Sequence, residues 1–215
     1  MRRIKVWDLP VRLFHWAIVV LIFFAWGSQE LGYMEWHVWI GCTILTLILF
    51  RIAWGIIGSD TARFSRFLRS PLAALTHLRH ITRREADKEV GHNAAGGWMV
   101  LVMLLLIAIQ AGTGLFSNDD GQTEGPLMHF VSKDQSDWLS RIHSLNFTLI
   151  EIAIVLHVLA ILAYAVLKRQ NLVRPMLTGV KDMPGDTAAP RMVSPLWALV
   201  TLAVAAGFVT WLVRL

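Results

Sequence analysis

Residues 141–167 read RIHSLNFTLIEIAIVLHVLAILAYAVL. This run is long enough to cross a bilayer as a helix, because a hydrocarbon core of about 30 Å needs about 20 apolar residues. It also contains His143 and His157. At about 100° and about 1.5 Å per residue, their spacing puts the two imidazoles on one face, about 21 Å apart along the axis. One helix therefore presents two histidines at two depths of a membrane.

The composition of the whole chain is that of a membrane protein. Of its 215 residues, 55% are hydrophobic and only 16% are charged. The apolar residues fall in long blocks rather than in the short stripes of a soluble core. We predict a single all-α membrane domain over residues 1–215, a bundle of four core helices with a fifth at the C-terminus. The predicted spans are approximately residues 10–27, 35–57, 93–116, 141–167 and 195–213.

The lone cysteine and the scattered basic charge exclude several classes of protein. Cys42 is the only cysteine, so the sequence has no disulfide framework, no CxxC zinc or redox pair and no CxxCH attachment motif. The net charge of +5 is divided among several connectors and forms no basic stripe. Nucleic acid is therefore not an expected partner.

The distribution of Lys and Arg predicts the orientation in the membrane. Basic residues gather in residues 2–12, in the 58–92 connector and in the 168–194 connector, which five spans place on one side. The 117–140 loop has one lysine and five acidic residues. Because short cytoplasmic loops are rich in Lys and Arg, we predict a cytoplasmic N-terminus and a periplasmic C-terminus. The 58–92 connector is expected to include a short interfacial helix over residues 71–82.

Four histidines lie in or at the mouths of the predicted spans: His15, His37, His143 and His157. An imidazole in hydrocarbon is costly unless it is paired, so each is a functional candidate. The predicted topology pairs His15 with His157 toward the cytoplasm and His37 with His143 toward the outside. Two imidazoles can provide both axial ligands of a haem iron, so these pairs predict two haem b groups, one near each face. The alternative is four structural histidines bonded to neighbouring helices.

Arginines and glycines at the same depths are secondary candidates. A guanidinium matches a haem propionate, although two of these arginines could equally extend to lipid phosphate. Glycines would let a flat macrocycle approach the backbone, or would simply let helices pack closely. The arginines are Arg12, Arg51 and Arg141, and the alternative of contact with lipid phosphate applies to Arg12 and Arg51. The glycines are Gly41, Gly96, Gly97, Gly112 and Gly114.

Other polar residues lie near the predicted spans. His92 and Asn93 precede the third span and could bind a quinone carbonyl and exchange its proton, or serve as a solvated histidine and a helix cap. Glu151 lies mid-helix and suggests either a proton path or a protonated packing residue. His77 and His80 lie among arginines and are expected to face solvent or lipid headgroups.

Several short motifs together resemble a known family. They are Val6–Pro10 with Arg12 and Phe14–Trp16, Gly91–Asn93 with Gly96, Leu156–Val158, Asn171–Val173, and Met176 with Thr178 and Gly179. The chain is similar in these motifs to the bacterial cytochrome b561 family, which includes the cytochrome b subunits of nickel-iron hydrogenases. Ala94 departs from the usual proline after the Gly-His-Asn motif.

The resemblance implies a four-helix dihaem core in the bacterial inner membrane that exchanges electrons with the quinone pool. It supports ligand roles for His15, His37, His143 and His157, and a position near quinone for His92 and Asn93. It does not name the redox partner. It also leaves open whether the chain acts alone as a quinone reductase or a quinol oxidase.

Three functions are compatible with these features. The first is electron transfer between quinone and an extracytoplasmic partner, such as a c-type cytochrome or a dehydrogenase or hydrogenase subunit. The second is oxidation of superoxide with quinone as the acceptor, and the third is a structural bundle without a cofactor. The acidic 117–140 loop favours the first function, because acidic charge repels superoxide and attracts a basic protein.

Overall fold

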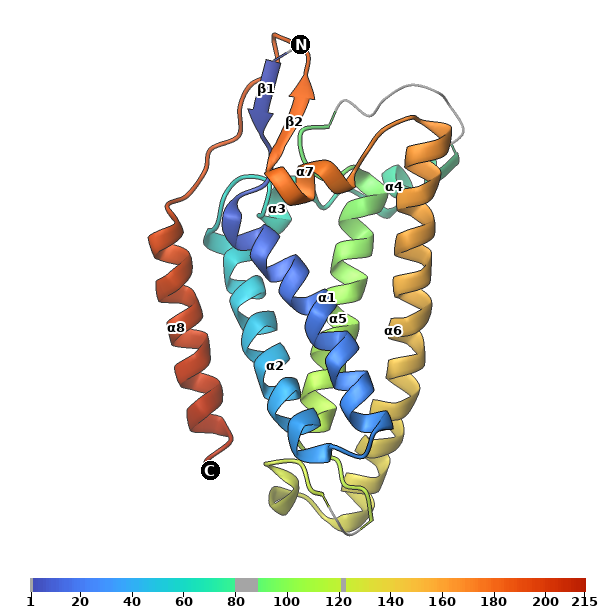
Figure 1. Cartoon of the computed structure of the whole chain (residues 1–215), viewed down its shortest axis with the longest axis vertical. Coiled ribbons are helices and arrows are strands. Elements are labelled where there is room, and N and C mark those ends of the chain that lie inside the picture. The colour runs from blue at the N-terminus through green and yellow to red at the C-terminus, as the bar shows by residue number, and fades with distance from the viewer. Residues whose placement is uncertain (1, 80–88, 121–122) are drawn as a thin grey trace. The chain divides into compact units, whose positions relative to one another are not determined.

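The structure is a computed structural model that describes residues 2–79, 89–120 and 123–215 (Figure 1). Within these residues, five helices are long and apolar enough to cross a membrane. They are α1 (Leu9–Glu30), α2 (Met34–Ile57), α5 (Ala94–Gly114), α6 (Lys133–Leu167) and α8 (Pro195–Leu212). The predicted all-α membrane bundle is confirmed.

Short elements connect these helices. The connector after α2 contains α3 (Phe64–Phe67) and α4 (Pro71–Arg79), so α4 corresponds to the predicted interfacial helix. The remaining short elements are β1 (Arg2–Lys5), η1 (Met128–Phe130), α7 (Val173–Thr178) and β2 (Val180–Met183). Residues 80–88, including His80 and the basic residues Arg83, Arg84 and Lys88, lie outside the described residues.

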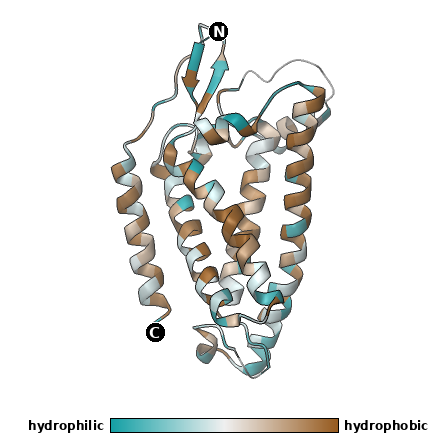
Figure 2. Ribbon diagram, viewed as in Figure 1, coloured by the Kyte–Doolittle hydropathy of each residue, from teal (hydrophilic) through white to brown (hydrophobic). Residues whose placement is uncertain are grey.

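The surface of the long helices is apolar. Figure 2 shows hydrophobic residues along α1, α2, α5, α6 and α8, and hydrophilic residues in β1, β2 and the loop after α5. Large apolar side chains on these helices are exposed, among them Leu13, Phe23, Leu105 and Val166. In water such a surface would be unfavourable, whereas a bilayer covers it without cost. The chain is therefore a membrane-spanning protein.

The contacts of the chain form two compact units that each draw on several helices. The first unit contains Met1–Leu13, Ile52–Val102 and Ala153–Ala198. The second unit contains Phe14–Arg51, Met103–Ile152 and Leu199–Leu215. The short elements α3, α4, α7, β1 and β2 belong to the first unit, and the loop between α5 and α6 belongs to the second.

A small antiparallel sheet in the first unit was not predicted. β1 pairs with β2 from Arg2 opposite Met183 to Lys5 opposite Val180, and Figure 1 shows the two strands side by side. The backbone N–H groups of Val6 and Trp7 extend the pairing by donating to the Gly179 carbonyl, at 2.8 and 3.1 Å. No pattern in the sequence predicted this sheet, because strands of four residues show too little alternation to reveal a period.

Asp8 fixes the start of α1. Its Oδ1 accepts a hydrogen bond from the Val11 N–H at 2.8 Å, which is the N-cap interaction that an aspartate favours. Its Oδ2 accepts from Trp54 Nε1 at 3.0 Å. The carboxylate is only 3% exposed, and both of its oxygens are bonded. One side chain therefore caps α1 and joins it to the end of α2 within the first unit.

The start of α6 lies earlier than predicted. The helix begins at Lys133, whereas the predicted span began at residue 141. Ser132 and Gln135 form a reciprocal capping box, in which Ser132 N donates to Gln135 Oε1 at 2.9 Å and Gln135 N donates to Ser132 Oγ at 3.3 Å. The polar first turns hid this start from a search for apolar residues, although the capping motif was present in the sequence.

Candidate functional site

His37 and His143 lie together in the second unit. Their ring centroids are 6.1 Å apart and their planes are inclined by 75°. A metal–imidazole bond is about 2 Å long and the ring centre lies about 1 Å beyond the nitrogen, so two imidazoles on opposite sides of one iron have centroids about 6 Å apart. The observed separation fits a pair of axial ligands.

The other nitrogen of each ring is held by a backbone carbonyl. His37 Nδ1 donates to the Ala25 carbonyl at 2.9 Å, and His143 Nδ1 donates to the Gln110 carbonyl at the same distance. Because a carbonyl oxygen only accepts, each Nδ1 carries the proton and each Nε2 keeps its lone pair. Metal-binding histidines are commonly oriented in this way. Both rings therefore have the tautomer that an iron ligand needs.

A cavity of about 330 Å³ adjoins the two histidines, and three glycines line it, among them Gly41 and Gly114. A Cβ at Gly41 would meet no atom within 4 Å, so the missing side chain leaves open space. A Cβ at Gly114 would lie 3.0 Å from Cε1 of His143, so glycine gives the ring room beside α5. Apolar side chains line much of the cavity, including Ile22, Ile44, Ile107, Phe147 and Ile150. This lining suits a flat apolar macrocycle.

Neutral polar groups line another part of this cavity. They include Gln29, Ser117, Asn118, Ser140 and Ser144, and the carboxylate of Asp119 also belongs to the lining. None of the described residues that line it is a lysine or arginine, and Arg141 is exposed. Amide and hydroxyl donors are therefore the propionate-binding groups that this lining provides.

Two amide side chains that sequence reasoning missed support the His37–His143 pair. Asn146 is only 4% exposed, and its Nδ2 donates to Gln110 Oε1 at 2.7 Å and to the Leu106 carbonyl at 2.9 Å. Gln110 provides the carbonyl that orients His143. Polar residues inside spanning helices were the signal that could have identified both.

Arg12 and Arg51, the other two arginines predicted to bind propionate or lipid phosphate, are surrounded by protein groups. Arg12 donates through Nε to the Met176 carbonyl at 3.3 Å and through Nη2 to the Leu177 carbonyl, so it binds the last turn of α7. Arg51 is 2% exposed, which does not suit contact with lipid phosphate.

His15 and His157, the second predicted pair, are both half-buried. His15 belongs to the second unit, where its ring lies edge-on to Trp16 with centroids 4.9 Å apart. His157 belongs to the first unit. The pairing of these two histidines stays a prediction. Glu151, which lies between His143 and His157 on α6, is exposed on the protein surface.

Asn93 and His92 have well-defined surroundings in the first unit. Asn93 Oδ1 accepts a hydrogen bond from Gly96 N at 2.8 Å, so Asn93 caps α5. A helix cap was one of the two roles predicted for this residue. Its Nδ2 lies 2.6 Å from the hydroxyl of Tyr164, a residue that the sequence did not single out. The ring of His92 contacts Trp7 and Phe67, with centroids 4.6 and 4.7 Å away.

His77, which was expected to face solvent or lipid headgroups, is half-buried and contacts another helix. Its Nε2 lies 2.5 Å from the Tyr164 hydroxyl, and the two rings are parallel to within 12°. The neighbouring arginines suggested an exposed position because sequence cannot show that α4 contacts the end of α6.

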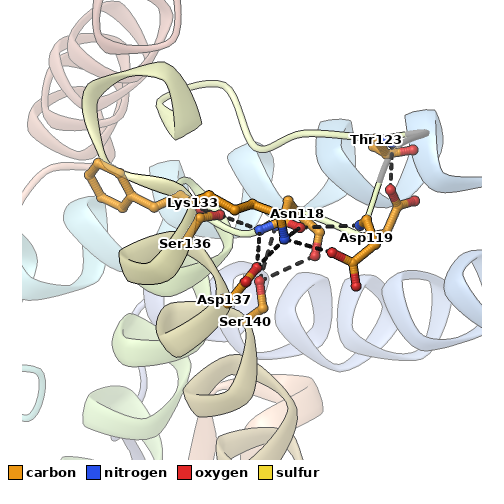
Figure 3. Close-up of polar contacts among 9 residues, drawn as sticks. Asn118, Asp119, Thr123, Lys133, Ser136, Asp137 and Ser140 are labelled. Carbon is orange, nitrogen blue, oxygen red and sulfur yellow. Dashed lines mark hydrogen bonds and ion pairs between the residues drawn. The ribbon is translucent and has the colours of Figure 1, made fainter.

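The acidic loop between α5 and α6 is tied to the first turns of α6 (Figure 3). Asn118 Nδ2 donates to Ser136 Oγ at 2.5 Å and to Asp137 Oδ1 at 3.0 Å. Lys133 Nζ lies 2.6 Å from Asp120 and also pairs with Asp137. Two of the five acidic residues counted in the sequence are therefore paired with the one lysine of the loop.

The structure defines the class of protein as a membrane-spanning helical bundle with a pair of histidines inside it. The family model for the prokaryotic cytochrome b561 matches residues 6–179. The chain belongs to this family, and it is a membrane b-type cytochrome of electron transfer. Neither the curated proteins nor the solved structures gave a match. Helix α8 lies beyond the matched residues.

Proposed function

We propose that this chain is a dihaem cytochrome b, working as a single membrane domain, that transfers electrons across the bacterial inner membrane. It connects the quinone pool with an extracytoplasmic redox protein, and its N-terminus is cytoplasmic. The observation that carries the proposal is the His37–His143 pair, with centroids 6.1 Å apart and both Nδ1 atoms bonded to backbone carbonyls.

His37 and His143 hold the outer haem in this proposal, and His15 and His157 hold the inner one. A haem iron with two imidazole ligands takes up and releases one electron without changing its ligands. The protein orients the imidazoles, excludes water and leaves space at Gly41 and Gly114. The spacing of His143 and His157, about 21 Å along α6, separates the two sites by depth.

The outer end of the electron path faces a protein rather than a small anion. Glu124 and Asp134, two of the acidic residues of the 117–140 loop, are exposed. Their charge would attract a basic partner, such as a c-type cytochrome or a subunit of a dehydrogenase or hydrogenase, and would repel superoxide. At the other end, His92 and Asn93 lie near the quinone.

Spectra of single-histidine variants test this assignment. The reduced wild-type protein should show a b-type α band with two haems per chain. His143→Ala should lose the outer haem and His157→Ala the inner one, so each variant should keep half of the haem. Pyridine haemochrome analysis measures this ratio, and His129→Ala, in the exposed η1 segment, is the control.

Two results would contradict the proposal. A wild-type protein without a b-type α band would exclude the haem sites altogether. Loss of both haems from either variant, with the helical circular dichroism spectrum unchanged, would contradict the pairing by depth.

A further inference from the structure

A polar cluster in the first unit joins Asn93 to Tyr164 and His77, two residues to which the sequence analysis assigned no function. Tyr164 is 5% exposed, and its hydroxyl lies 2.6 Å from Asn93 Nδ2 and 2.5 Å from His77 Nε2. The three side chains come from α6, from the cap of α5 and from α4. Polar groups buried in a membrane protein are costly, which makes a functional use of this cluster the first hypothesis to test.

The cap of α5 gives these hydrogen bonds a direction. Because Asn93 Oδ1 accepts from Gly96 N, the Nδ2 group is the part of the amide that faces Tyr164. Asn93 therefore donates to the phenol oxygen, and a phenol proton directed to His77 Nε2 would continue the chain. A neutral His77 that accepts at Nε2 carries its own proton on Nδ1. The cluster thus has the order of a proton relay that ends at His77.

His77 also lines an open cavity of about 670 Å³ in the same unit, and so does His92. This volume is in the range of small-molecule sites. Other polar residues of the lining are Arg69, Ser70, Thr76 and Glu89. Two imidazoles therefore line one cavity, and an imidazole can form a hydrogen bond with each of the two carbonyl groups of a quinone.

We propose that His77 exchanges a proton with quinone bound in this cavity, and that Tyr164 and Asn93 are positioning residues that fix its tautomer and resupply its proton. The inference rests on the proposed function, which provides the electrons. In the direction of reduction, quinone gains two electrons from the b-type centres and one proton on each carbonyl oxygen.

The proton for one carbonyl follows the hydrogen bonds of the cluster. The Nδ1–H bond of His77 breaks as an O–H bond forms on the quinone, and the O–H bond of Tyr164 breaks as an N–H bond forms at Nε2. Tyr164 then takes a proton from water, which leaves hydroxide, and rotation of the His77 ring restores an N–H group that faces the quinone. The second carbonyl takes its proton from water through His92, and quinol oxidation runs the same steps in reverse.

The charges around the relay suit this step. Lys168 Nζ lies 5.2 Å from the centre of the Tyr164 ring, and a nearby cation stabilises negative charge on a phenol oxygen. Arg69 adds a second cation in the cavity lining, where Glu89 is the one carboxylate among the described residues. Tyr164 also follows His157 by two helical turns on α6, which puts both on one face about 10 Å apart. The relay is therefore close to the predicted inner ligand.

The test uses the full-length haem-loaded protein with decylubiquinone as the probe. The protein is reduced with dithionite, and stopped-flow spectroscopy follows oxidation of the α band by the quinone. We expect Tyr164→Phe to lower the maximal rate about 100-fold and to increase the solvent deuterium isotope effect. His77→Gln should be at least as slow. The half-saturating quinone concentration, and equilibrium binding of decylubiquinone measured by ultrafiltration, should change less than about twofold in Tyr164→Phe.

Ferricyanide provides a matched comparison, because it takes one electron and no proton. Its rate with both variants should equal that of the wild type. The chain has two tyrosines, so Tyr33→Phe, at an exposed site, is the control for Tyr164→Phe. His129→Gln is the corresponding control for His77→Gln.

The outcomes separate this inference from the proposed function. If Tyr164→Phe reacts with decylubiquinone as fast as the wild type does, the relay is wrong and the proposed function stands. If Tyr164→Phe lowers the rates of oxidation by decylubiquinone and by ferricyanide equally, the substitution has damaged the electron path, and the relay is also wrong. If the wild type reacts with ferricyanide but not with decylubiquinone, both proposals are wrong.

Discussion

At the scale of single residues, the geometry of the proposed ligand pair, His37 and His143, depends on groups that are not themselves proposed ligands. The Ala25 and Gln110 carbonyls fix the tautomer of His37 and His143, and Asn146 holds Gln110. Gly114 provides the space that the His143 ring occupies beside α5. The sequence pointed to the histidines because imidazoles in apolar helices are rare, but their orientation comes from carbonyls that every residue has.

Gly114 offers a direct test of this packing. In Gly114→Ala the new Cβ would lie 3.0 Å from His143 Cε1, so the ring must move. We expect strain of about 1–3 kcal/mol, a shifted midpoint potential and partial loss of one haem. Gly112→Ala is the matched control, because a Cβ there meets no atom within 4 Å. Redox titration of the α band measures the effect, and identical potentials in the two variants would contradict the tight fit.

At the scale of the elements, composition and caps explain the helices, whereas the short segments depend on contacts. Apolar length alone predicted five spans, and all five are present. The capping box formed by Ser132 and Gln135 stabilises a start of α6 at Lys133, earlier than the apolar residues alone predicted. The β1–β2 sheet joins segments about 180 positions apart, so no local pattern could have revealed it.

The buried Asp8 contact should stabilise the first unit measurably. Asp8→Ala removes the cap of α1 and leaves Trp54 Nε1 without its acceptor, which should cost about 1–3 kcal/mol of unfolding free energy. Asp8→Asn keeps an oxygen acceptor and should lose less. Thermal unfolding in detergent, followed by circular dichroism, makes the comparison. Asp186→Ala, at an exposed position, is the control, and an equal loss in that variant would argue against a specific role for Asp8.

At the scale of the whole molecule, the distribution of charge predicts the partner and the orientation. Basic connectors and one acidic loop lie at opposite ends of the predicted topology. Lys133 pairs with Asp120 and Asp137, so the acidic character of the loop rests on fewer carboxylates than the sequence count suggests. A basic redox protein remains the partner that this charge favours.

Salt dependence tests the predicted partner. The rate of electron exchange with a basic c-type cytochrome should fall as ionic strength rises from about 0.01 to about 0.15 M, because the Debye length shortens from about 30 to about 8 Å. The double variant Glu124→Gln, Asp134→Asn should be slower at low salt and less sensitive to salt. Asp186→Asn, in the 168–194 connector, should behave as the wild type. A rate that does not depend on salt would contradict the acidic docking surface.

The sequence by itself determined the membrane class, the five spans, the family and the four candidate ligand histidines. Hydropathy and helical spacing are properties of one continuous segment, so they can be read without knowing its neighbours. Only the tertiary structure brought His77 to Tyr164, 87 positions away, and Asn93 to Tyr164, 71 positions away. It also selected the carbonyls that orient His37 and His143. These are contacts between distant segments, and their identity depends on how the segments pack rather than on any pattern within one of them.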